Sequence, residues 1–131
     1  MKKLLLMGLI GLSITAVSCD KHKEHYGTYT TTETRTYEGS MMAGDVDLSD
    51  QTYILNVEEK NNKEIILENV YEAGTRVNME IEGSALTIRK QSLDGFLDIE
   101  GTGSISDNVI HLNYKVLTPD GNVVCVLHAA K

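Results

Sequence analysis

Cys125 and His128 carry the side chains that could form a thiolate–imidazole pair for nucleophilic catalysis. They stand three positions apart in a segment with a two-residue hydrophobic period, so an extended strand directs them to opposite faces. Cys125 shares a face with Leu127, and we expect a small buried or half-buried thiol. The strand patterns also suggest no inward carboxylate of the kind that a glycosidase needs. We therefore expect no enzymatic activity.

No spacing of cysteine, histidine and carboxylate residues matches a zinc or iron site. His22 and His25 stand in the polar run DKHKEH, residues 20–25, which could be a weak metal-binding tract or a solvated linker. We favour the linker and expect neither a metal nor a cofactor.

A second cysteine, Cys19, follows a distinctive segment. Two lysines precede an apolar run over residues 4–17, which is shorter than the ~20 residues of a transmembrane helix. Small residues occupy positions 16 and 18, and a cysteine directly after such a cleavage point is the feature of a bacterial lipoprotein signal. We predict cleavage after residue 18 and lipidation of Cys19, with palmitate among the acyl chains. The lipid would anchor the protein to a membrane of the cell envelope.

Three regions follow from this reading: a lipoprotein signal peptide at 1–18, a lipidated tether at 19–25 and one domain at 26–131. Cleavage leaves 113 residues with a formal charge of −9, because the signal removes two lysines from a chain of charge −7. That balance argues against binding of nucleic acid. One proline and eleven glycines fit a turn-rich β protein.

From Tyr26 the hydrophobic period becomes two. The threonines at even positions 28–36 share one face of a strand, and the opposite face carries tyrosines, Thr31, Glu33 and Arg35. We expect the tyrosine face inward and the threonine face in water, although a row of hydroxyls could also bind a ligand. The stretch 38–50 then reads as a long loop that contains Met41 and Met42, adaptable apolar residues able to cover an opening.

Turn signals separate the remaining strands and predict their pairing. Lys60-Asn61-Asn62 predicts Val57 opposite Ile65, and 73–75 predicts Tyr71 opposite Val77. Gly83-Ser84 and Asp107-Asn108 predict two-residue hairpins, the second of which sets Gly101 against Tyr114 and Gly103 against Leu112. Pro119-Asp120-Gly121 predicts a three-residue turn that sets Leu112 opposite an inward-facing His128.

Each turn, read separately, keeps one apolar face in phase along the chain. The pattern predicts an all-β protein, an antiparallel up-and-down meander of about eight strands that forms a small barrel or a curled half-barrel. Bulky inward residues, with two glycines among them, favour a small or absent cavity.

Several short motifs also resemble a known group: Ser18-Cys19-Asp20-Lys21, Tyr26-Gly27-Thr28-Tyr29, Leu86-Thr87-Ile88 with Gln91, and Gly101 to Ile105 followed by Tyr114. The chain is similar to small lipoproteins of Bacteroidota whose mature part is a lipocalin-like, or calycin-like, β-barrel. Gly27-Thr28-Tyr29 stands where lipocalins carry Gly-X-Trp. The resemblance implies a barrel without enzymatic activity.

These observations predict a lipid-anchored envelope lipoprotein, with the outer membrane as the expected location. It would act as a binding module for a small molecule or an envelope protein at one rim of the barrel. The candidate binding residues are His128, Tyr114, Met41 and Met42, and Cys19 supplies the membrane anchor. The alternative is a structural or inhibitory interaction protein that uses its outer surface and has no ligand cavity.

Overall fold

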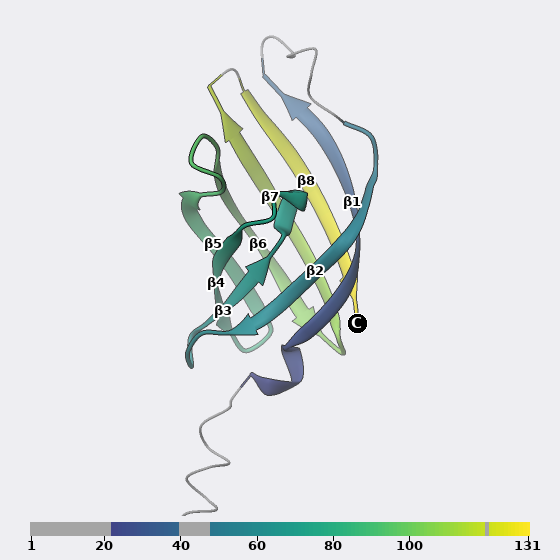
Figure 1. Cartoon of the computed structure of the whole chain (residues 1–131), viewed down its shortest axis with the longest axis vertical. Helices are drawn as coiled ribbons and strands as arrows, with labels where there is room; N and C mark the ends of the chain where they lie inside the picture. Colours follow the sequence, from purple (N-terminus) through teal and green to yellow (C-terminus); the bar gives the residue numbers. More distant parts are fainter. Residues whose placement is uncertain (1–21, 40–47, 120) are drawn as a thin grey trace, which may run out of the picture.

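The computed structural model describes residues 22–39, 48–119 and 121–131, and these form a closed barrel of eight antiparallel strands (Figure 1). Each strand pairs with its neighbours along the chain, and the first strand pairs with the last. The predicted all-β meander is confirmed, and it closes fully. The elements in chain order are η1 (Lys23–His25), β1 (Gly27–Glu38), β2 (Gln51–Glu59), β3 (Glu64–Glu68), η2 (Val70–Glu72), β4 (Arg76–Glu82), β5 (Ala85–Ser92), β6 (Asp98–Ser106), β7 (Val109–Thr118) and β8 (Gly121–Ala130).

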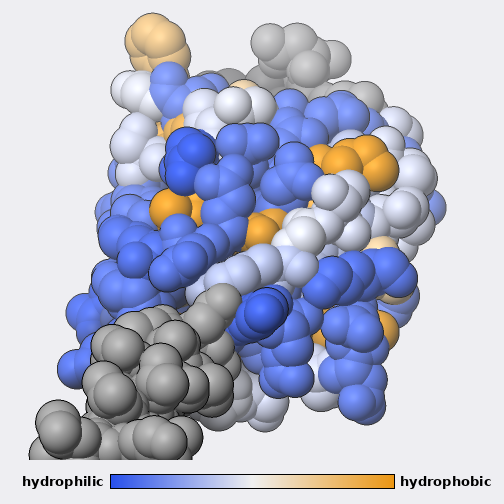
Figure 2. Space-filling view, turned by 60° about the horizontal axis from the view of Figure 1, so that its bottom comes forward, coloured by the Kyte–Doolittle hydropathy of each residue, from blue (hydrophilic) through white to orange (hydrophobic). Residues whose placement is uncertain are grey.

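Alternation along the strands fills most of the interior with apolar side chains. Because successive residues of a strand point to opposite faces, one set from each strand meets inside the barrel. The outer surface is mostly hydrophilic, with small separate apolar patches on the face shown in Figure 2. The buried apolar residues are Tyr29, Tyr53, Leu55, Val57, Ile65, Leu67, Val70, Val77, Met79, Ile81, Leu86, Ile88, Leu93, Ile99, Ile105, Ile110, Leu112, Tyr114, Val116, Val123, Cys125, Leu127 and Ala129.

The two hairpins with the clearest turn signals form as predicted. Asp107 and Asn108 adopt φ of 52° and 64°, the left-handed conformation of a tight two-residue turn. This turn sets Gly101 against Tyr114 and Gly103 against Leu112. An added Cβ at Gly101 would lie 2.5 Å from the carbonyl oxygen of residue 113, so the close approach of β6 and β7 requires glycine there.

The pairing around β3 differs from the prediction by an even number of residues. Val57 lies opposite Leu67 rather than Ile65, and Val77 also lies opposite Leu67 rather than Tyr71. Four residues connect β2 to β3, and the 3₁₀ turn η2 holds Tyr71 outside the strand ladder. An even shift leaves the side chains of β3 and β4 on their predicted faces, which is why the apolar residues of both strands still point inward.

The pairing of β7 with β8 differs by one residue, and the consequence is larger. Thr118 pairs with Gly121, which leaves a two-residue connection where three were expected. Leu112 therefore lies opposite Leu127, and the predicted inward position of His128 is wrong. The Thr118 hydroxyl accepts from the Gly121 amide at 3.2 Å and donates to its carbonyl at 2.6 Å, which closes this tighter turn.

The barrel has two different ends, called lower and upper as in Figure 1. At the lower end η1 packs beneath β1, where the Tyr29 hydroxyl donates to the carbonyl of His25 at 2.8 Å. His22 is buried and hydrogen-bonds to the carbonyl of Asn62 at 2.7 Å, so the expectation of a solvated linker is wrong for His22. At the upper end β1 finishes and β2 begins. No helix within the described residues is long and apolar enough to cross a membrane.

Candidate functional site

The structure separates the residues predicted for the site. Tyr114 is buried inside the barrel, 1% exposed. His128 points outward from β8 and lies edge-on to His111 of β7, with 4.8 Å between ring centroids. Cys19, Met41 and Met42 lie outside the described residues. Tyr114 and His128 therefore do not share a site.

The structure adds Glu33 to the candidate site, a residue that the sequence analysis did not select. Its carboxylate is directed from β1 into the barrel. Glu33 is 1% exposed, which corrects the expectation that no carboxylate faces inward. One oxygen, Oε1, accepts hydrogen bonds from the hydroxyls of Tyr53, at 2.8 Å, and Tyr114. The other, Oε2, accepts from Nε of Arg35 at 2.7 Å. The signal was in the sequence, since Glu33 shares the tyrosine face of β1.

Strands β1, β2 and β7 build this cluster, and the 3₁₀ turn η2 lies against it. Glu33 and Arg35 are two apart on β1, so their side chains point the same way. Tyr53 begins the inward face of β2, and Tyr114 reaches across from β7, where the glycine opposite it leaves room. A buried carboxylate is tolerated only when it is paired and hydrogen-bonded. Three donors meet that requirement here.

Arg35 extends the cluster toward the upper end. Its side chain is 8% exposed, and Nη2 donates to the carbonyl of Tyr71 at 3.2 Å. Its guanidinium carbon lies 4.0 Å from the centroid of the Tyr71 ring, a cation–π geometry. The Tyr53 hydroxyl accepts from the Tyr71 amide at 3.0 Å. Tyr71 is thus held by two members of the interior cluster.

Burial controls the ionisation of the cluster. Loss of hydration raises the pKa of Tyr53 and of Tyr114 well above 10, and the nearby Glu33 charge adds to the shift. Burial by itself would lower the pKa of Arg35, but its hydrogen bond and ion pair with Glu33 outweigh that effect and raise it. Both phenols therefore stay neutral donors, and Arg35 stays charged.

Cys125 lies beside the cluster, on the β8 position that pairs with both Arg35 and Tyr114. It is fully buried, as expected. Burial raises the pKa of its thiol to about 12, so the nucleophilic thiolate is not formed at neutral pH. The hydroxyl of Thr31, on the same face of β1 as Glu33, is buried and has no hydrogen-bond partner within the described residues. The cluster can thus bind and orient a group, but it presents no activated nucleophile.

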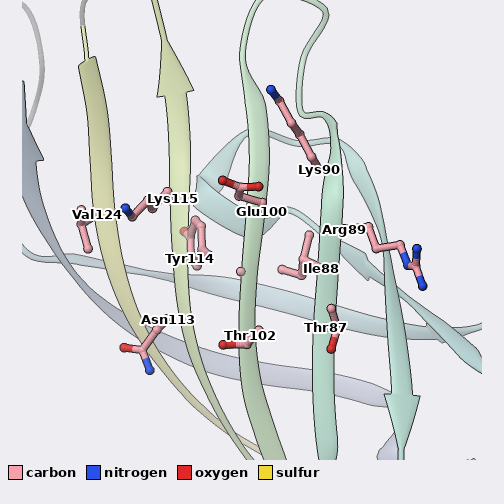
Figure 3. Close-up of a pocket in the computed structure, with 11 residues that line it drawn as sticks. Thr87, Ile88, Arg89, Lys90, Glu100, Thr102, Asn113, Tyr114, Lys115 and Val124 are labelled. Atoms are coloured by element: carbon pink, nitrogen blue, oxygen red, sulfur yellow. The ribbon is translucent and has the colours of Figure 1, made fainter.

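A second feature lies on the outside of β5–β8. A shallow groove of about 690 Å³ crosses these strands where β5 bulges between Ile88 and Gln91 (Figure 3). The close-up shows the amine of Lys115 extending toward the strand of Val124, away from Glu100, and Tyr114 directed behind the sheet. The groove is lined by Thr87, Ile88, Arg89, Lys90, Glu100, Gly101, Thr102, Asn113, Tyr114, Lys115 and Val124. Most of these side chains are polar, and both signs of charge are present.

Comparison with protein-family models, curated proteins and solved structures gives no match to this chain.

Proposed function

We propose that this protein is a lipid-anchored lipoprotein of the cell envelope, similar to lipocalin-like lipoproteins, and a non-catalytic binding module. Its recognition surface is the upper rim of the barrel. The observation that carries this proposal is Arg35, a charged group fixed by Glu33 and placed where β1 approaches the upper end. Protein sites for small molecules place a few fixed polar groups among apolar side chains, and Arg35 is such a fixed group, with the Tyr71 ring against its guanidinium.

The position of the anchor supports use of the upper rim. Only residues 20 and 21 separate Cys19 from His22, which is buried at the lower end. Three residue steps span at most about 10 Å. A lipidated Cys19 would hold the lower end against the membrane and leave the upper rim facing away from it. The outer membrane remains our expected location.

The absence of catalysis is part of the proposal. Cys125 faces the interior and His128 the outside, so the two do not form a nucleophile and base. Glu33 accepts from three donors and has Arg35 as its counter-ion, an arrangement that fixes a charge rather than transferring a proton.

The anchor is tested by labelling cells with a palmitate analogue. The wild type and Cys125→Ser should incorporate the label, and Cys19→Ser should not. Equal labelling of Cys19→Ser would remove the anchor from the proposal. Cys125→Ser is the matched control because it removes the other cysteine of the chain.

The binding role is tested by native mass spectrometry of the protein purified from its own envelope. A retained small molecule or envelope protein should be present on the wild type and on Arg89→Met, and should be lost from Arg35→Met protein that circular dichroism shows to be folded. Arg89 pairs with Glu80 on the outer surface, so it controls for loss of an arginine. Deletion of residues 41–44 should also weaken retention while thermal stability stays near wild type. Retention by Arg35→Met at the wild-type level would contradict binding at the rim.

The outer groove supports the second candidate, an interaction protein that uses its outer wall. Thr102 lines this groove and points away from the interior. In that case Thr102→Arg, which fills the groove with a large side chain, should abolish retention of a partner, and Arg35→Met should not. The same measurement therefore distinguishes the two surfaces.

A further inference from the structure

The connection between β3 and β4 has an unfavourable backbone. We call residues Asn69–Ala73 the strap. Asn69, Tyr71 and Glu72 have φ of 81°, 61° and 56°, a left-handed conformation that side chains disfavour. Asparagine tolerates it, but tyrosine and glutamate adopt it rarely. Strain of this kind persists where the surroundings impose it, and it is concentrated at ligand clamps and switches.

The contacts that impose this conformation converge on Tyr71. Its amide donates to Tyr53, its carbonyl accepts from Arg35, and its ring lies beneath the Arg35 guanidinium. The amide N–H, the carbonyl oxygen and the ring of Tyr71 thus each contact a side chain of the barrel interior. These are the groups that any aromatic ring attached to an amide would offer.

The groups that receive Tyr71 are also held by contacts outside the strap. Arg35 is oriented by Glu33 at 2.7 Å and Tyr53 by the same carboxylate at 2.8 Å. Glu33 is in turn held by Tyr114. Contacts outside the strap therefore hold the site in place, and such preorganisation favours tight binding of a replacement group.

We propose that Tyr71 occupies, as an internal ligand, a binding site for an aromatic side chain with its peptide amide, and that the strap is the lid such a ligand displaces. This inference rests on the proposed binding role of the upper rim. An incoming aromatic amide would replace the contacts of Tyr71 one for one while the strained strap relaxes. A carboxylate is a poorer fit, because Glu33 already balances the charge of Arg35 and the chain carries −7.

The site is tested first by removing the Tyr71 side chain that occupies it. In Tyr71→Gly the ring is gone, and glycine keeps the left-handed backbone without strain. N-acetyl-L-tyrosinamide should then bind saturably in an NMR titration, with shifts at Arg35 and Tyr53, and at least tenfold more tightly than to the wild type. N-acetyl-L-leucinamide is the control and should bind at least tenfold more weakly. Equal binding of the two amides, or no binding, would overturn the site.

The role of Arg35 and Tyr53 is tested in the same background. Adding Tyr53→Phe removes one hydroxyl and should weaken binding of the tyrosine amide several-fold, and adding Arg35→Met should abolish it. Thr34→Val, at an outward position of the same strand, should leave it unchanged. Unchanged affinity in both the Tyr53 and Arg35 variants, each confirmed as folded by its amide spectrum, would also overturn the site.

The lid is tested in the wild type by hydrogen exchange. Saturating tyrosine amide should accelerate exchange of the Tyr71 and Glu72 amides at least fivefold and leave the amide of Leu55 in β2 unchanged. If exchange of the strap does not respond, Tyr71 is a permanent plug and the lid is refuted. An envelope ligand lost from Arg35→Met would then still support the proposed function, so the two failures are distinguishable.

Discussion

Glu33 and Arg35 form an ion pair inside the barrel, with 2.7 Å between Nε and Oε2 and with both side chains less than one tenth exposed. Threonines alternate with them on the outward face of β1. Strand β1, which consists mostly of polar residues, thus supplies the most polar part of the barrel interior. The pair is the centre around which the tyrosines of β2 and β7 are arranged.

Removing one partner of this pair should destabilise the fold strongly. We expect Arg35→Met to lower the free energy of unfolding by about 3–5 kcal/mol, because it leaves a buried carboxylate without a counter-ion. Arg89→Met, which breaks the exposed pair with Glu80, should have little effect. Urea denaturation of both variants measures the difference. An Arg35→Met protein as stable as Arg89→Met would mean that the buried Glu33 does not depend on Arg35 as its counter-ion.

The buried phenols should make the fold sensitive to alkali. Burial raises the pKa of both Tyr53 and Tyr114 above the ordinary value of 10.0. Below pH 10 both the folded and the unfolded chain keep these protons, so the stabilisation is complete. Above it the unfolded chain loses them first, and stability should fall by up to about 1.4 kcal/mol per pH unit for each phenol.

Denaturation curves at pH 8, 10 and 11 test this dependence. Tyr53→Phe should start less stable at pH 8, since Glu33 loses a donor, yet lose less on going to pH 11. A loss as steep as that of the wild type would show that Tyr53 does not contribute to the alkaline transition.

Gly103→Val should be much more damaging than Thr102→Val. A Cβ at Gly103 would lie 2.7 Å from Cδ2 and 2.9 Å from Cα of Leu112, and would also collide with the carbonyl oxygen of His111. Overpacking typically costs about 1–3 kcal/mol. Thr102 points outward and should accept valine. Thermal melts of the two variants compare their stabilities. A Thr102→Val protein less stable than Gly103→Val would contradict the pairing of β6 and β7.

Cys125 should be unreactive in the folded protein. Its thiol is buried and its pKa of about 12 leaves almost no thiolate at pH 8. In a Cys19→Ser chain, where it is the single cysteine, an aromatic disulfide reagent should react at the rate of unfolding and become fast in urea. Rapid reaction without denaturant would place the thiol at an open surface.

The sequence determined those features that depend on local chemistry. A two-residue period assigned the inward face of β1, β2 and β6, and an Asp-Asn turn with positive φ fixed the pairing of β6 with β7. Lipidation of Cys19, by contrast, remains a prediction from the sequence, because Cys19 lies outside the described residues.

Tertiary structure decided those features for which the local sequence allows more than one conformation. Pro119 to Gly121 permits a two- or a three-residue turn, and closure of the barrel against β1 selects the shorter one, which buries Cys125 and exposes His128. The period of β1 placed Glu33 on the inward face, but its partners Tyr53 and Tyr114 are 20 and 81 residues away. A pattern of neighbours in the chain cannot show that three strands bring a carboxylate, a guanidinium and two phenols together. Only the closed sheet does so, because it fixes which residues of separate strands share one level of the interior.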